Sequence, residues 1–182
     1  MKNIYFIRHG EGYHNLYNYD YHNWHLEYPR LTTKGIKQCL HVKENVKNVD
    51  IILVSPLRRT LETAEFIFDK SNKFLAIDYI REFISNPCDY KESNKEISLN
   101  FDYVDFSMSY DNYDYNKKET EGDVNERIIL FYKYLQNSEY NNIAVVTHGA
   151  FLERFIKKYG DNLNIENKEW FDNCEVRKGT LN

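Results

Sequence analysis

The chain has 182 residues, of which 42% are hydrophobic, and a formal net charge of -4. This length and composition predict one globular domain spanning residues 1–182. The negative charge argues against a general nucleic-acid-binding protein, and no apolar run in the sequence is long enough to cross a membrane.

Two further features bear on location. The N-terminus leads directly into a predicted strand, so we expect no signal peptide. The cysteines, Cys39, Cys88 and Cys174, are widely separated and form neither a CxxC metal pair nor a disulfide framework. They suit a reducing compartment, and we therefore expect a cytoplasmic protein.

The first predicted strand ends in a polar triplet. Residues 4–7 are a short apolar run that predicts a buried strand, and Arg8, His9 and Gly10 follow it directly. Ligands of open α/β sheets bind beyond the carboxyl ends of strands. Arg8 can hold an anion, His9 can act as nucleophile, base or ligand, and Gly10 permits a sharp turn. A solvated arginine beside a structural histidine remains the alternative for this triplet.

Residues 16–29 lack periodicity and predict a loop. The spacing of His14, His22 and His25 fits no metal-binding pattern, so we interpret these as surface histidines. A helix then begins after Thr32 or Thr33 as N-cap. Its predicted buried face is formed by Ile36, Leu40, Val42 and Val46.

Residues 50–54 predict a second buried strand, followed by a helix that reaches about Lys70. Ser55 is the expected N-cap and Pro56 the first helical residue, with Leu61, Ala64, Ile67 and Phe68 facing inward. Arg58 and Arg59 then lie in the first turn, where the helix N-terminus favours a bound anion. Two solvated arginines are the alternative reading of that turn.

The rest of the chain continues the alternation of strands and helices. Residues 74–80 predict a strand, 86–89 a turn, 102–114 an acidic loop or lid, 119–136 a helix, 143–147 a strand, 150–159 a helix, and 173–181 an edge strand. This order predicts an α/β fold with a mostly parallel central sheet and helices on both faces, arranged in three layers.

Polar side chains follow each of the predicted parallel strands. Arg8, His9, Arg59, Glu82 and His148 should therefore meet in one pocket at the carboxyl edge of the sheet. The arginines and the second histidine can cradle a tetrahedral dianion, a neutral His9 can attack phosphorus, and Glu82 can protonate the leaving oxygen. The sequence shows no metal-ligand cluster, so we predict that neither a metal nor another cofactor is used.

Three motifs carry a family resemblance: Arg-His-Gly at 8–10, the run from Ser55 to Ala64, and Val-Thr-His-Gly at 146–149. Together they resemble the histidine phosphatase superfamily, also called phosphoglycerate mutase-like, over essentially the whole chain. Longer matches at 8–15, 86–89, 104–107 and 173–175 resemble a branch found in fungi, plants and protists.

The resemblance implies roles for individual residues. It implies that His9 is phosphorylated and that Glu82 lies where phosphatases of the family keep their proton donor. Arg58 receives at most a peripheral role. The substrate-binding residues that it implies are Arg8, Asn15, Arg59, His148 and Gly149.

We therefore expect a phosphatase that hydrolyses a small phosphorylated molecule through a phosphohistidine. A phosphoglycerate mutase is the first alternative, although mutases of the family are implied to be longer and to enclose their substrates. A non-catalytic protein that binds phosphorylated ligands is the second alternative. Specificity is expected to lie in residues 16–29 and 94–118, which match no motif that names a substrate.

Overall fold

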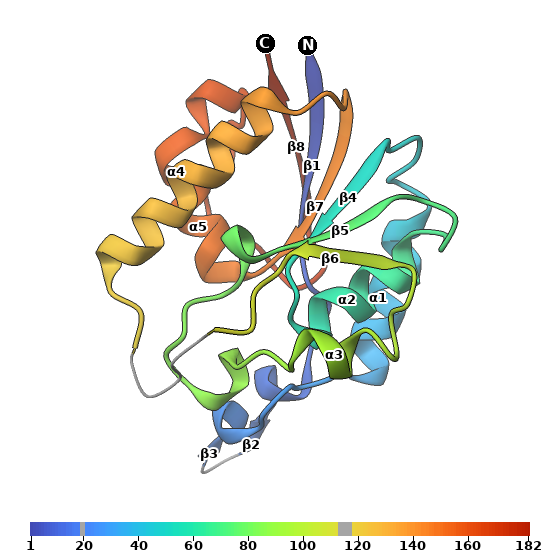
Figure 1. Ribbon diagram of the computed structural model, residues 1–182, viewed down its shortest axis with the longest axis vertical. Helices are drawn as coiled ribbons and strands as arrows, with labels where there is room; N and C mark the ends of the chain where they lie inside the picture. Colours follow the sequence, from blue (N-terminus) through green and yellow to red (C-terminus); the bar gives the residue numbers. More distant parts are fainter. Residues whose placement is uncertain (19–20, 113–117) are drawn as a thin grey trace.

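The computed structural model of the protein describes residues 1–18, 21–112 and 118–182. Its centre is a six-stranded sheet with the strand order β6-β5-β4-β7-β1-β8 (Figure 1). The strands are β1 (Lys2–Arg8), β4 (Ile51–Val54), β5 (Phe74–Ile77), β6 (Val104–Met108), β7 (Asn142–Thr147) and β8 (Val176–Leu181). All neighbours pair in parallel except β8, which runs antiparallel to β1.

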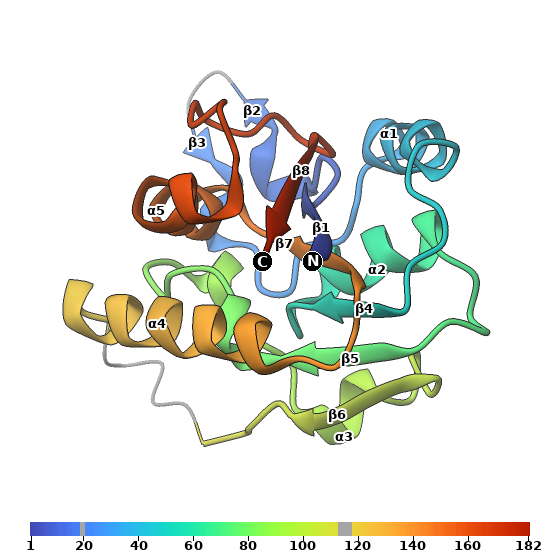
Figure 2. The same cartoon turned by 90° about the horizontal axis from the view of Figure 1, so that it is seen from above.

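Helices cover both faces of this sheet (Figure 2). On one face lie α1 (Thr33–Lys43), α2 (Arg58–Ile67) and the short α3 (Asn94–Ile97), and on the other lie α4 (Glu121–Asn137) and α5 (Gly149–Tyr159). The predicted three-layer α/β fold is confirmed. None of the helices in the described part of the chain is long and apolar enough to span a membrane.

Two apolar cores follow from the alternation of side chains along the strands. In β1, Ile4 and Phe6 pack with α4 and α5, whereas Ile7 packs with α1 and α2. Residues 51–54 of β4 divide between the two cores in the same way. Each fully buried aliphatic or aromatic side chain contributes about 1.5–3 kcal/mol, so these strands are fixed in place at the centre of the molecule.

The predicted start of α1 is confirmed, but its predicted buried face is wrong at Leu40, and Val46, although buried, lies beyond the end of the helix at Lys43. Thr32 is the N-cap, and its hydroxyl accepts a hydrogen bond from the Gly35 amide at 3.0 Å. Leu40 is 52% exposed, whereas Cys39 and Val42 are buried. The helix presents positions 35, 39 and 42 to the sheet, and Leu40 lies one residue, about 100° of helical rotation, away from that stripe.

The predicted cap of α2 is wrong. The helix begins at Arg58 after Leu57 and ends at Ile67, with no side-chain cap at its N-terminus. Ser55 is fully buried, and its hydroxyl lies 2.8 Å from His148 Nε2. A serine that normally signals a cap is used here for a tertiary contact, which the local sequence does not reveal.

Two loop predictions also change. Within residues 102–114, Val104–Met108 form the edge strand β6, in which Val104 is buried and Asp105 is exposed, while 113–114 lie outside the described residues. Within residues 16–29, the pair β2 (Tyr17–Asn18) and β3 (Tyr21–His22) precedes the 3-10 helix η2 (Asn23–His25), and 19–20 lie outside the described residues.

The predicted third strand ends at Ile77 and continues as η3 (Asp78–Ile80).

Candidate active site

The carboxyl ends of the central strands converge on one pocket of about 240 Å³. Residues following β1, β4, β5 and β7 contribute to it, as the parallel arrangement requires. Its lining includes Arg8, His9, His14, Asn15, Trp24, Arg59, Glu82, Phe83, Ser85, Asn86, Asp89, Gly149 and Trp170. His148 lies directly behind His9, with the two ring centroids 5.2 Å apart.

His9 is buried and oriented by its own backbone neighbour. Its Nδ1 lies 2.7 Å from the Gly10 carbonyl oxygen, and since a carbonyl only accepts, Nδ1 carries the proton. Nε2 of the neutral ring therefore bears the lone pair. Burial, reinforced by the positive charge of Arg59, holds the pKa of His9 well below its usual value. The imidazole is thus neutral at physiological pH.

Two guanidinium groups flank this histidine. Arg59, in the first turn of α2, is 2% exposed and donates from Nη1 to the Cys88 carbonyl at 2.6 Å. Arg8, at the end of β1, donates from Nη1 to the Phe171 carbonyl at 2.7 Å. The Nε atom of each arginine is buried without a hydrogen-bond partner among the described residues. Each arginine thus keeps donor capacity for a ligand.

His148 follows β7 and is fully buried. Its Nε2 contacts the Ser55 hydroxyl, and its Nδ1 has no hydrogen-bond partner in the described part of the chain. Burial, followed by the charge of Arg59, lowers the pKa of His148 well below its usual value, so this ring is also neutral in the unliganded protein.

Glu82 brings a carboxyl group to the same pocket. Its Oε1 accepts a hydrogen bond from the Phe83 amide at 3.1 Å, and its Oε2 accepts one from the Ala150 amide at 3.2 Å in the first turn of α5. Burial and then the negative charge of Asp89 raise the pKa of Glu82, against the opposing effect of Arg59. This carboxyl group therefore retains a proton to higher pH than an exposed one.

The remaining predicted residues, Asn15 and Gly149, also line the pocket. The Asn15 side-chain oxygen accepts hydrogen bonds from the Gly12 amide at 3.0 Å and from Asn173 Nδ2 at 3.4 Å. At Gly149, a Cβ atom would approach Trp170 Cζ2 to 2.6 Å, so no side chain fits there. The structure thus brings every predicted site residue to one place.

A sequence profile of the histidine phosphatase superfamily, branch 1, matches residues 4–180. The chain belongs to this superfamily. A probable phosphatase of Schizosaccharomyces pombe is 29% identical over 96% of this chain and 88% of its own length. A phosphoglycerate mutase-like protein of Arabidopsis thaliana is 26% identical over 97% of this chain and 83% of its own length.

Solved structures agree with the histidine phosphatase fold. The ecdysone phosphate phosphatase of Bombix mori, solved in complex with tungstate, superimposes with a TM-score of 0.71 at 17% identity. The match covers 98% of this chain and 88% of the other. At this identity the likeness shows the fold alone, while the superfamily match and the relatives' names support a phosphatase.

One residue beside the pocket of this superfamily member was assigned wrongly from the sequence. His14, in the 3-10 helix η1 (Tyr13–Asn15), is not on the surface: it is 8% exposed, and its ring centroid lies 5.3 Å from that of His9. Burial, followed by the charges of Arg59 and Arg8, lowers its pKa to about 2. His25 is exposed as predicted, and the side chain of His22 lies outside the described residues.

A sequence signal for His14 exists in Gly12, where a Cβ atom would lie 2.7 Å from His14 Nδ1. The missing side chain at Gly12 leaves room for this ring. Asp89, which the sequence offers only as a reserve candidate for the acid role after Glu82, also lines the pocket. Its Oδ2 accepts hydrogen bonds from the Ser85 and Asn86 amides, and its Oδ1 lies 3.6 Å from Arg59 Nη2.

Arg58 is directed to a different partner from its neighbour Arg59. Its Nε donates to Glu92 Oε2 at 2.6 Å, its Nη2 pairs with the other oxygen of the same carboxylate, and it does not line the pocket. Adjacent residues at the start of α2 thus differ in role because a helix turns by about 100° per residue. The peripheral placement implied for Arg58 agrees with this geometry.

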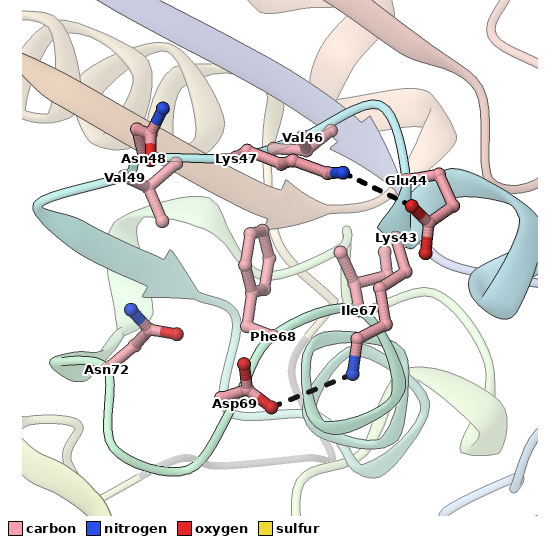
Figure 3. A pocket seen from close by; sticks show the side chains of 10 residues that line it. All are labelled: Lys43, Glu44, Val46, Lys47, Asn48, Val49, Ile67, Phe68, Asp69 and Asn72. Carbon is pink, nitrogen blue, oxygen red and sulfur yellow. Dashed lines mark hydrogen bonds and ion pairs between the residues drawn. The ribbon is translucent and has the colours of Figure 1, made fainter.

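A second hollow, of about 380 Å³, lies at the opposite, amino edge of the sheet between the segments that lead into β4 and β5 (Figure 3). Its charged residues are paired with one another: Lys47 with Glu44 at 3.2 Å and Lys43 with Asp69 at 3.7 Å. Val46 and Phe68 are buried in its wall. Its described lining contains no histidine or cysteine, and we assign no chemistry to it.

Proposed function

We propose that this protein is a phosphatase that hydrolyses small phosphomonoesters through a phosphohistidine on His9. The observation that carries the proposal is the buried, neutral His9 between two arginines whose Nε atoms have no hydrogen-bond partner in the described part of the chain. A nucleophile with a free lone pair and a cationic cradle is the arrangement that phosphoryl transfer to a side chain requires.

In the first step, the lone pair of His9 Nε2 forms a bond to phosphorus as the bond from phosphorus to the leaving oxygen breaks. Glu82 transfers its proton to that oxygen, which departs as a neutral alcohol. Arg8, Arg59 and His148 stabilise the charge on the transferred phosphoryl oxygens. Asn15 and the backbone at Gly149 complete the substrate-binding set.

In the second step, water attacks the phosphohistidine and the bond from Nε2 to phosphorus breaks. The Glu82 carboxylate left by the first step accepts a proton from this water, which restores both residues. Inorganic phosphate then leaves. The raised pKa of Glu82 supports this exchange of roles, because a carboxyl group poised to hold a proton can also return to that state.

We further propose that the reaction needs no metal and that the protein works in the cytoplasm. The two guanidinium groups supply the positive charge that a metal ion provides in many phosphoryl-transfer enzymes. No group of three or more His, Cys, Asp or Glu able to hold a metal occurs in residues 1–18, 21–112 and 118–182. The three cysteines are free thiols, which supports a reducing compartment.

Phosphate release from p-nitrophenyl phosphate tests this proposal. We expect turnover that persists in EDTA, is abolished in His9→Ala and is unchanged in His41→Ala, which alters an exposed histidine at the end of α1. The Arabidopsis relatives' names make the interconversion of 3- and 2-phosphoglycerate, primed with the bisphosphate, the matching test for a mutase. Mutase activity without phosphate release would contradict the proposal.

A further inference from the structure

Beyond the phosphoryl-binding residues, the mouth of the pocket is aromatic. Trp24, Phe83 and Trp170 line it and come from three separate segments: η2, the loop after η3, and the segment before β8. The two tryptophans are 45% and 49% exposed. Large apolar side chains gathered half-exposed around one concave site indicate a surface for an apolar ligand group.

Hydrogen bonds from Arg177 hold the segment that carries Trp170 in place. This guanidinium is buried and donates to three carbonyl oxygens, at 3.1, 2.7 and 2.9 Å, on Asn167, Glu169 and Trp170. It also lies 3.7 Å from the ring centroid of Phe171. The exposed indole is therefore presented by an ordered backbone, which lowers the entropy lost when a ligand packs against it.

The indole of Trp170 also borders the phosphoryl site. Its ring lies over Gly149 at the start of α5, and its centroid is 5.3 Å from the Arg8 guanidinium carbon. Another part of the boundary is formed by η2, which carries Trp24 and packs against η1 and the 3-10 helix η4 (Pro87–Asp89). When Arg8 holds the phosphoryl group of a substrate, the rest of that substrate therefore extends along the aromatic surface.

The described residues that line this mouth add no further positive charge. Arg8 and Arg59 are the only Lys or Arg side chains in the described lining. Its small polar residues are engaged with each other, since Ser85 Oγ donates to Asp89 at 3.1 Å and Asn86 Nδ2 donates to Ser85 Oγ at 3.1 Å. A substrate carboxylate would therefore compete with the phosphoryl group for the same two arginines.

We infer that the substrate is a small phosphomonoester whose leaving group carries a flat aromatic ring, held against Trp170 and facing Trp24. The inference rests on the proposed function and specifies its substrate class. The pocket, at about 240 Å³, is below the usual range for drug-sized ligands, which fits a phosphoryl group with one ring system. Small carboxylate-bearing phosphates are disfavoured by the same lining.

Intrinsic fluorescence gives a direct test, because the chain has two tryptophans and both line this pocket. Benzylphosphonate and n-propylphosphonate, which resist hydrolysis, are titrated into the wild-type protein, and orthovanadate serves as a probe of the phosphoryl site alone. We expect benzylphosphonate to bind about tenfold more tightly than propylphosphonate, a preference typical of stacking on one aromatic face.

Three variants locate that preference. Trp170→Ala should reduce it to within about threefold while vanadate still binds, Trp170→Phe should keep most of it, and Leu40→Ala, an exposed apolar change on α1, should leave it unchanged. Equal binding of the two phosphonates to the wild type overturns the inference. So does a preference that survives in both Trp170→Ala and Trp24→Ala, or 3-phosphoglycerate binding as tightly as benzylphosphonate.

A turnover measurement separates failure of this inference from failure of the proposed function. 2-Phenylethyl and n-propyl phosphate both release primary alcohols, so a higher kcat/KM for the first reports the ring and not leaving-group chemistry. Turnover of both at equal kcat/KM, abolished in His9→Ala, leaves a phosphatase without the aromatic subsite. Phosphonate binding with the expected ring preference but no turnover of any ester supports the subsite and contradicts the phosphatase.

Discussion

The sheet has a hollow at each edge, and the two hollows differ in how their polar groups are paired. At the amino edge the charged side chains pair with one another on the surface (Figure 3). At the carboxyl edge four buried nitrogen atoms have no hydrogen-bond partner among the described residues: Arg8 Nε, His14 Nδ1, Arg59 Nε and His148 Nδ1. Volume alone would not identify the candidate active site, since the hollow at the amino edge is the larger of the two.

The unpaired groups at the carboxyl edge reduce the stability of the folded protein. A buried donor or acceptor without a partner costs about 1–3 kcal/mol, and native proteins contain few of them. We propose that those of Arg8, Arg59 and His148 are retained because a bound phosphoryl group completes their hydrogen bonds. The predictions below test this contrast from the largest expected effect to the smallest.

Arg59→Lys should reduce kcat/KM by about 100-fold or more, because lysine keeps the charge but loses the planar fork that matches phosphoryl oxygens. The matched control is Arg58→Lys, the same change one residue earlier at an arginine paired with Glu92. It should stay within about threefold of wild type. The reverse result would place Arg58 in the working position and contradict the assignment of Arg59.

Glu82→Gln should slow turnover of alkyl phosphates by roughly 10- to 100-fold and that of p-nitrophenyl phosphate much less, because nitrophenolate leaves without a proton. In the wild type, activity on alkyl phosphates should fall as pH rises through the raised pKa of Glu82, since only the protonated form donates. Glu44→Gln, at an exposed carboxylate paired with Lys47, is the control. Equal losses on both substrates would remove Glu82 from the acid role.

The pH dependence of stability should report the buried histidines. His14 stays neutral in the folded state because its pKa is lowered to about 2, whereas the unfolded chain protonates it near pH 6.5. The unfolded state therefore binds more protons, and the free energy of unfolding falls as pH falls below 6.5. For one such histidine the loss between pH 7 and 5 is about 2 kcal/mol.

His9 and His148 contribute in the same direction, whereas Glu82, with its raised pKa, gives an opposite and partly compensating effect. Urea denaturation of wild type and His14→Asn at both pH values isolates one residue. The variant should lose about 2 kcal/mol less than the wild type over this interval. An identical loss in the two proteins would show that His14 is not held neutral.

Lys43→Met at the amino edge should change stability by less than about 0.5 kcal/mol, because the ion pair with Asp69 is exposed on both sides. Phosphatase activity should be unaltered. Chemical denaturation and a kcat/KM measurement check both statements. A loss of activity would mean that the amino-edge hollow influences the reaction. It would contradict the claim that only the carboxyl-edge pocket takes part in it.

Much of the fold was predictable because strand periodicity and short apolar runs are local signals. Residues 4–7, 51–54 and 143–146 are aliphatic or aromatic throughout, and each lies in a central strand. The edge strand β6 was missed, because an edge position requires fewer apolar residues and its alternation resembles a polar loop. The extent of the domain, residues 1–182, stays a prediction.

The candidate site was predictable for a different reason: a parallel sheet places the ends of its strands together, so four short motifs define one pocket. Contacts made across the fold were not predictable. Ser55 reads locally as a helix cap but contacts His148, and His14 reads as a loop residue but packs beside His9. Cys39 and Cys174 are 135 residues apart, yet their Sγ atoms lie at 3.8 Å.

The central claim, that the unpaired groups at the carboxyl edge serve a phosphoryl group carried by His9, is tested most directly by trapping the intermediate. The protein is mixed with a radiolabelled phosphomonoester, quenched in denaturant at high pH and digested for mass spectrometry. The account predicts label on His9 that survives base and is lost in acid, and no label in His9→Ala. Turnover without label on His9, or acid-stable label on another residue, would contradict it.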